Sequence, residues 1–207
     1  DLVIMILNSL GIEITPLLAS LGIGGLAVAL ALQDTLANYF AGIYMSTDKS
    51  VRLGEYVELD NGLKGYVDKI EWRTTRIRML SNNFVIIPNK KLADSIITNY
   101  YQPAKEMSVL VQVGVAYDSD LDKVEKVTLD VAKKVMKKVE GTVKDFDPFI
   151  RYNEFGDSNI KFSVILRVEE FVTKYLLTHE FIKALKKRYD KEKIEIAFPC
   201  RNVYMRK

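Results

Sequence analysis

Histidine and cysteine, the residues most used in zinc sites and nucleophile–base pairs, are nearly absent from this sequence. It contains one histidine, His179, and one cysteine, Cys200, among 207 residues. A structural zinc site takes four Cys or His ligands, and a serine or cysteine nucleophile needs a base beside it, so the sequence predicts neither. His179 falls inside a predicted helix with no partner identifiable from the sequence, and we interpret it as a structural residue. We expect no enzyme, no metal site and no cofactor.

Two motifs resemble binding sites, but each lacks an essential part. Gly22–Gly25 (GIGG) has the glycines of a phosphate loop without the GxGxxG spacing or the preceding strand of a dinucleotide site. Asp118, Asp120 and Asp122 alternate as in a calcium loop, without its central glycine and final glutamate. Carboxylates are favoured at the positive end of a helix, so we interpret these three as residues of a helix start.

Charge divides the chain into two parts. Residues 1–48 contain four acids and no lysine or arginine, whereas residues 49–207 contain all 30 basic residues and 23 of the 27 acids. The net charge of +3 is too small to argue for a nucleic-acid partner, and we expect none. A soluble or membrane-associated RNA-binding module remains an alternative for the second part. A membrane-anchored enzyme is disfavoured by the missing nucleophile–base pair.

Residues 1–48, the part without lysine or arginine, have the apolar composition of membrane helices. Pro16–Leu32 is seventeen residues long with only Ser20 polar, which as a helix spans about 25 Å of the ~30 Å hydrocarbon core. We therefore assign residues 1–10 to the end of a preceding transmembrane helix and 11–47 to a second membrane helix with an interfacial continuation. The chain opens on Asp1 without the basic start of a signal peptide, so we expect a further membrane part before it. A buried helix of a soluble protein is the alternative.

Two patterns on this helix indicate how copies of it would pack. Small residues at four-residue spacing let helix backbones approach closely in lipid. These residues are Ser20, Gly24, Gly25, Ala27, Ala29 and Ala31. A single helical stripe contains Ile23, Leu26, Leu30, Gln33 and Ala37. If several copies packed through the small residues, Leu26 and Leu30 would form two stacked rings, although a heptad-like core stripe fits the spacing equally well.

The first basic residues, Lys49 and Arg52, follow this helix directly. Lysine and arginine just after a membrane helix mark its cytoplasmic side. We therefore place the residues after about 48 in the cytoplasm.

The rest of the chain predicts two small domains. Residues 48–102 contain five short strand candidates with a hairpin signal at Asn61-Gly62, which suggests a small β-barrel. Residues 103–207 predict strands and helices in the order β-α-β-β-α-β, ending with a strand over Ile194–Phe198. That order is the ferredoxin-like α+β arrangement.

Several motifs resemble the mechanosensitive channel of small conductance (MscS) family. They are Gly25–Ile43 (GLAVALALQDTLANYFAGI), Arg52–Leu59 (RLGEYVEL), Gly65–Arg78 (GYVDKIEWRTTRIR), Phe84–Leu92 (FVIIPNKKL), Val113–Asp120 (VGVAYDSD) and Ile196–Cys200 (IAFPC). The resemblance implies a homo-heptameric ring with a pore-lining helix, a Sm-like β domain at 48–102 and a cytoplasmic α/β domain. It implies a multi-pass protein of the inner or plasma membrane, which opens under tension and releases ions and small osmolytes during hypo-osmotic shock. The partners would be other copies of the chain and membrane lipids.

The resemblance also implies roles for single residues. Leu26 and Leu30 match the two leucines that close the pore, and Gly25, Ala27 and Ala29 match small residues through which pore helices pack. The pore helix would bend at Gln33-Asp34 and again at Gly42; Asp34 stands where some members have the glycine of the kink. Two further residues, Leu32 and Leu36, match apolar positions that contact the preceding membrane helices.

Overall fold

The computed structural model describes residue 9 and residues 13–201. The expected end of a preceding transmembrane helix, residues 1–10, therefore lies almost wholly outside the described residues. The chain divides into two compact units, Asp1–Asn99 and Tyr100–Lys207, and each is described by itself.

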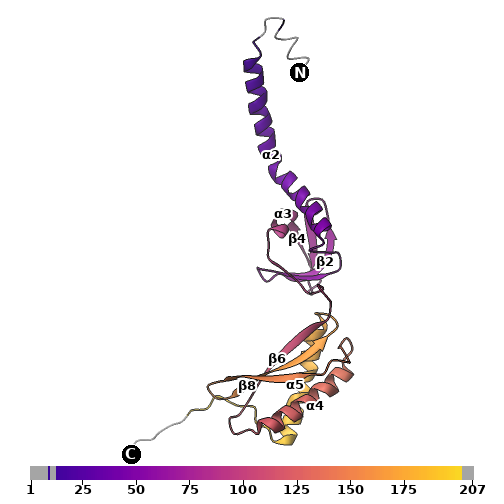
Figure 1. Cartoon of the computed structure of the whole chain (residues 1–207), viewed down its shortest axis with the longest axis vertical. Helices are drawn as coiled ribbons and strands as arrows, with labels where there is room; N and C mark the ends of the chain where they lie inside the picture. Colours follow the sequence, from indigo (N-terminus) through magenta and orange to yellow (C-terminus); the bar gives the residue numbers. More distant parts are fainter. Residues whose placement is uncertain (1–8, 10–12, 202–207) are drawn as a thin grey trace, which may run out of the picture. The chain divides into compact units, whose positions relative to one another are not determined.

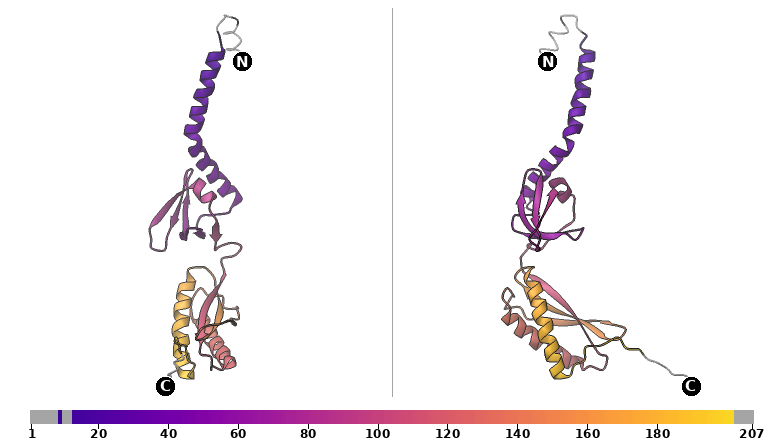
Figure 2. Two further views of the ribbon diagram at one scale, coloured as in Figure 1. Left: turned by 90° about the vertical axis from the view of Figure 1, so that its left-hand side faces the viewer. Right: turned by 180° about the vertical axis from the view of Figure 1, so that it is seen from behind.

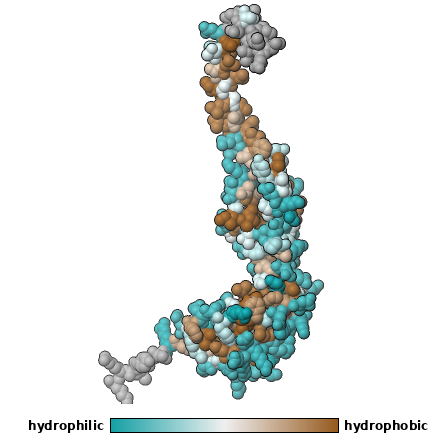
Figure 3. Space-filling model, viewed as in Figure 1, coloured by the Kyte–Doolittle hydropathy of each residue, from teal (hydrophilic) through white to brown (hydrophobic). Residues whose placement is uncertain are grey.

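The first unit begins with one long helix, α2, over Thr15–Asp48 (Figure 1). Pro16 stands in its first turn, where proline's missing N–H is not needed. The helix ends at Lys49, which adopts a left-handed conformation with φ of 55°. An apolar window of α2 has a mean hydropathy of 1.9 and is not buried against any described residue. This apolar stretch stands out along the helix in Figure 3. By length and composition α2 can cross a membrane.

A five-stranded antiparallel sheet follows α2 in the first unit. Its strands are β1 (Tyr56–Leu59), β2 (Lys64–Ile70), β3 (Thr74–Arg78), β4 (Phe84–Pro88) and β5 (Ile97–Asn99), with the short helix α3 (Asn89–Ala93) between the last two. The strand order is β4-β3-β2-β1-β5, so β4 and β5 form the two edges. Gly62 has φ of 80° in the β1–β2 turn and its N–H donates to Leu59 O at 2.9 Å, so the Asn-Gly signal marks the hairpin, with the positive φ at the glycine alone.

The core of this unit includes the end of α2. Met45 is buried in one cluster with Val67 of β2, Ile77 of β3 and Leu92 of α3. The last turns of the helix are therefore part of the β domain, whereas the first turns are exposed.

The second unit is an α+β domain. Its elements are β6 (Met107–Val115), α4 (Leu121–Lys138), β7 (Phe149–Phe155), β8 (Ile160–Val168) and α5 (Thr173–Glu192). The sheet order is β6-β8-β7. One face of β8 is buried along its whole length, and α4 and α5 pack against the sheet and against each other. Asp120 caps α4 by accepting the N–H groups of Asp122 and Lys123, which confirms its interpretation as a helix-start residue.

The prediction of a final strand over Ile194–Phe198 is wrong for the described residues, because residues 194–201 form no strand. The Ala116 N–H donates to Glu195 O at 3.2 Å, which is a single bond rather than a ladder. Ile194 is buried, but Ile196 and Phe198 are exposed at 39 % and 72 %. The apolar alternation that indicates a strand is real, but one chain offers it no neighbouring strand.

Candidate functional site

The predicted gate residues lie on the free part of α2. The side chains of Leu26 and Leu30 are 61 % and 62 % exposed, high values for leucine. They are four residues apart in one continuous helix, so they point to the same side about one turn apart. The described chain packs nothing against them.

Small residues of α2 line an open groove on the side of the helix opposite these leucines, since its lining residues project about half a turn away from them. The groove is lined by Leu17, Ser20, Leu21, Gly24, Gly25 and Val28. A Cβ atom added at Gly24 or Gly25 would meet no other atom within 4 Å. The other small residues expected to pack, Ala27, Ala29 and Ala31, are exposed as well. This surface is shaped for the close approach of another helix.

The residues expected to contact preceding helices, Leu32 and Leu36, are 47 % and 48 % exposed. Their contacts stay a prediction. The helix changes direction near its middle, as Figures 1 and 2 show. Within α2, Asn38 Nδ2 donates to Asp34 O at 2.8 Å. That Gln33 and Asp34 are the bend site also stays a prediction.

The C-terminal half of α2 contacts helix α3 of the β domain. Asp34, Asn38 and Gly42 are spaced by four residues and lie on one face. Asn38 Oδ1 accepts the backbone N–H of Lys90 at 2.9 Å, and Asp34 Oδ1 lies 3.8 Å from Lys90 Nζ. We call this set of contacts the α2–α3 junction.

Gly42 allows the closest approach in the α2–α3 junction. A Cβ at this position would lie 2.6 Å from Asn89 Nδ2. Asn89 is fully buried and held at both ends of its amide: Thr75 Oγ1 donates to Oδ1, and Nδ2 donates to Glu71 O, each at 2.8 Å. The structure thus gives Gly42 a packing constraint, and the bend that the resemblance implies at Gly42 stays a prediction.

The sequence reasoning missed Asn38, Asn89 and Lys90. The available signal was the four-residue spacing of Asp34, Asn38 and Gly42, which continues the four-residue row of Leu26 and Leu30 along the helix. The helix that these residues contact, α3, could not be predicted from the sequence, because it has only five residues and shows no periodicity.

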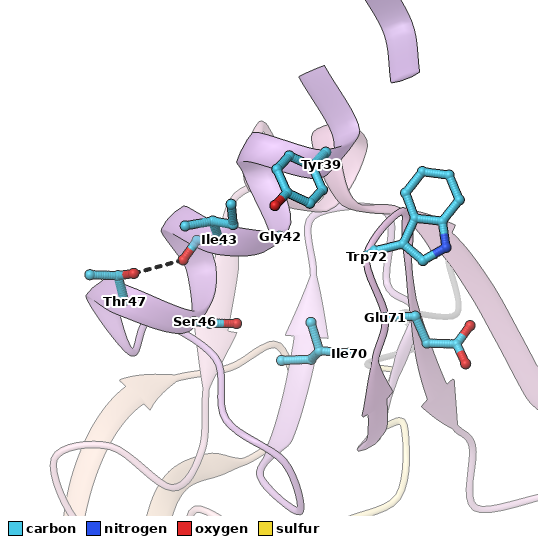
Figure 4. A pocket seen from close by; sticks show the side chains of 8 residues that line it. All are labelled: Tyr39, Gly42, Ile43, Ser46, Thr47, Ile70, Glu71 and Trp72. Carbon is cyan, nitrogen blue, oxygen red and sulfur yellow. Dashed lines mark hydrogen bonds between the residues drawn. The ribbon is translucent and has the colours of Figure 1, made fainter. Parts of the chain in front are cut away.

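A cavity of about 340 Å³ lies on the other side of the α2–α3 junction, between α2 and the end of β2. Figure 4 shows Tyr39, Gly42, Ile43, Ser46 and Thr47 of α2 facing Ile70, Glu71 and Trp72. Trp72 is 60 % exposed and stands in the turn between β2 and β3. Lys69 Nζ is 2.7 Å from Glu71 Oε1 and holds the pKa of the Glu71 carboxyl below its ordinary value.

A buried carboxylate fixes the loop that connects α2 to the sheet. Glu55 is 7 % exposed and accepts the backbone N–H of Arg52 at 2.8 Å and Nδ2 of Asn99 at 2.7 Å. Asn99 belongs to β5, so the exit of α2 is tied to the edge of the sheet. The site is therefore a helix that specific polar contacts join to a β domain.

The described residues place His179 and Cys200 at the surface. No group of three His, Cys, Asp or Glu side chains in residues 9 and 13–201 could hold a metal ion. His179 has a 62 % exposed side chain whose Nε2 lies 3.8 Å from Glu180 Oε1. Cys200 is exposed.

Three family models match the chain consecutively. "Mechanosensitive ion channel, transmembrane helices 2/3" covers residues 2–33, "Mechanosensitive ion channel, beta-domain" covers 34–102, and "Mechanosensitive ion channel MscS, C-terminal" covers 109–196.

Relatives and solved structures agree with these models. "Small-conductance mechanosensitive channel MscMJ" of Methanocaldococcus jannaschii is 39 % identical over 97 % of this chain, which spans only 57 % of that relative. An "Uncharacterized MscS family protein" of Archaeoglobus fulgidus is 30 % identical over 97 % of this chain and 69 % of its own length. The crystal structure of Helicobacter pylori MscS, in its closed state, superposes with a TM-score of 0.81 at 27 % identity, covering 99 % of this chain and 78 % of that one.

Proposed function

This chain belongs to the MscS family of mechanosensitive ion channels, and from that premise we propose that it forms the pore and cytoplasmic part of a channel opened by membrane tension. The channel releases ions and small osmolytes during hypo-osmotic shock. The observation that carries the proposal is α2: an exposed apolar helix with a leucine stripe on one face and a groove lined by small residues on the opposite face, joined at its end to a β domain.

The channel is a closed ring of identical copies, with seven as the family resemblance implies. The groove around Gly24 and Gly25 supports helix packing between copies. The sheet of the β domain has two open edges, β4 and β5, and Ile86 on β4 is 64 % exposed. Unlike edges of one sheet allow head-to-tail contacts, which close into rings when the rotation permits.

The protein is a multi-pass protein of the inner or plasma membrane. Lys49 and Arg52 follow α2 immediately, which supports a cytoplasmic position for the residues after about 48. Membrane lipids, permeant ions and small osmolytes are its partners in this role.

Leu26 and Leu30 close the pore by excluding water, as hydrophobic constrictions do. Keeping a leucine from water is worth roughly 1.5–3 kcal/mol, so one ring of seven contributes at most about 10–20 kcal/mol to the closed state. Partial wetting lowers this value, but a fraction of it is still large against thermal energy. A polar residue in one ring should therefore shift the gating equilibrium strongly.

We expect Leu30→Ser to open at lower tension or to leak in patch-clamp recordings of reconstituted protein under suction. Leu32→Ser is the matched control, because Leu32 is similarly apolar and exposed but lies off the stripe. Membrane insertion of both variants is checked by immunoblot. Normal insertion of Leu30→Ser with the parental threshold and no leak would contradict the gate assignment. The RNA-binding alternative instead predicts a chain that stays in solution without detergent.

A further inference from the structure

The α2–α3 junction combines contacts of different physical kinds. Asn38 Oδ1 accepts a backbone N–H from Lys90, and Gly42 packs on Asn89, and both contacts are short-ranged. The third contact, Asp34 Oδ1 to Lys90 Nζ at 3.8 Å, acts between two full charges. It is therefore the one of these three contacts whose strength depends strongly on dissolved salt.

The Asp34–Lys90 pair is well placed to respond to salt. The side chains of Asp34 and Lys90 are 90 % and 50 % exposed, so ions of the solution reach both. The screening length of water falls from about 30 Å at about 0.01 M salt to about 3 Å at about 1 M, a range that begins far above and ends below the separation of the two charges. A buried pair would be screened much less.

We propose that the Asp34–Lys90 pair is a salt-sensitive latch that docks the pore helix on the β domain. Low ionic strength tightens the latch and high ionic strength loosens it. The inference rests on the proposed function in one respect, namely that α2 lines a pore and that the junction faces the cytoplasm. Water entering a cell during hypo-osmotic shock dilutes the cytoplasmic salt, so the latch tightens during the event in which the channel operates.

One exposed pair has a modest effect, but a ring repeats it. Exposed ion pairs shift a local equilibrium by about 1.4- to five-fold at low salt, and less as salt rises. If each of seven identical copies contributes a factor of only about 1.5, the product is roughly 17-fold for a concerted transition. This makes the latch measurable in the assembled channel as well as in one junction.

Hydrogen exchange of the Lys90 amide tests the latch without any channel activity. This N–H is held by Asn38 Oδ1, and position 34 is remote from it in sequence, so Asp34→Asn leaves its intrinsic exchange rate unchanged. In the full chain in detergent at about 0.01 M salt, we expect Asp34→Asn to exchange this amide about 1.4- to five-fold faster than the parent, with the difference gone at about 1 M.

Asp48→Asn is the matched control, because it makes the same substitution at the end of the same helix, outside the junction. Its exchange at Lys90 should equal that of the parent at both salt concentrations. Equal exchange in Asp34→Asn and the parent at low salt would overturn the latch. Should Asp34→Asn fail to fold, Asp34→Ser, which removes the same charge, takes its place with the same two outcomes. The charge-exchanged pair, Asp34→Lys with Lys90→Asp, should keep the parental salt response.

The assembled channel gives the second test. The tension at half-opening should shift with salt at the cytoplasmic face in the parent and in Asp48→Asn, lose that part of the shift in Asp34→Asn, and regain it in the charge-exchanged pair. A parental salt response in Asp34→Asn contradicts the latch. A parent without any tension-activated current contradicts the proposed function instead, and the exchange experiment still decides whether the latch exists.

Discussion

Gly42 and Asn89 show how one missing side chain brings two elements together. The Asn89 amide is buried and bonded at both ends, so it cannot turn away from a new neighbour without breaking a hydrogen bond. Breaking it would leave a buried polar group unsatisfied. The contact therefore demands glycine on the α2 side, although glycine is a poor helix former.

Gly42→Ala should lower the thermal stability of the protein, because its Cβ would lie 2.6 Å from Asn89 Nδ2. We expect a loss of about 1–3 kcal/mol, as for other overpacked sites. Gly22→Ala is the control in the same helix, since a Cβ there meets nothing within 4 Å and alanine favours the helix. Thermal unfolding in detergent measures both variants, and equal melting temperatures for Gly42→Ala and the parent would refute the packing constraint.

Among the elements, α4 has an unusual C-terminal cap. Lys144 Nζ donates to Met136 O at 2.7 Å and to Val139 O at 2.6 Å, and it also contacts Lys137 O and Thr142 Oγ1. The last carbonyls of a helix have no partner within the helix and carry the negative end of its dipole. One ammonium group from the following loop satisfies several of them.

Lys144→Met keeps the apolar stem and removes the charge and its hydrogen bonds. We expect the second unit to lose about 1–2 kcal/mol of stability, measured by denaturant unfolding. Lys126→Met serves as the control, because Lys126 is an exposed residue of α4 far from its C-terminus. If both variants unfold at the same denaturant concentration, the cap contributes nothing.

Local signals predicted most elements, and they failed where an element depends on distant partners. The Asn61-Gly62 turn and the apolar periods of α2 and α4 are readable within a few residues of chain. Helix α3 escaped prediction because it has five residues and is held by contacts such as Asn38 to Lys90, 52 positions apart in sequence. The strand expected over Ile194–Phe198 has the right alternation, yet a strand forms only where another strand pairs with it.

The residues of the candidate site also fall into two groups, those predictable from local spacing and those that depend on distant partners. Leu26, Leu30 and the small residues lie within one helix, so their spacing alone places them on the faces where the structure has them. Asn89 and Glu55 gain their roles from partners in other strands and helices, and nothing in their local sequence announces those partners.

At the scale of the whole molecule, the exposed groove of α2 predicts an assembly. Native mass spectrometry in detergent should give a closed ring, with seven copies as the expected number. Gly25→Val adds bulk inside the groove and should weaken the ring or shift its gating tension, at a cost of about 1–3 kcal/mol per site. Gly22→Val adds the same bulk outside the groove lining and should change neither. A parent that is a clean monomer would contradict the assembly.

The turn between β2 and β3 gives the protein a built-in optical reporter. Trp72 is the sole tryptophan in these 207 residues, and it lines the cavity together with Tyr39 and Ile43 of α2. Because it is 60 % exposed, its emission wavelength depends on how much water surrounds the indole. Tryptophan fluorescence of the unlabelled chain therefore comes from one place, the meeting of the long helix and the β domain. A movement that opens or fills this cavity should change the emission wavelength of Trp72, which can be recorded without a dye or an engineered cysteine.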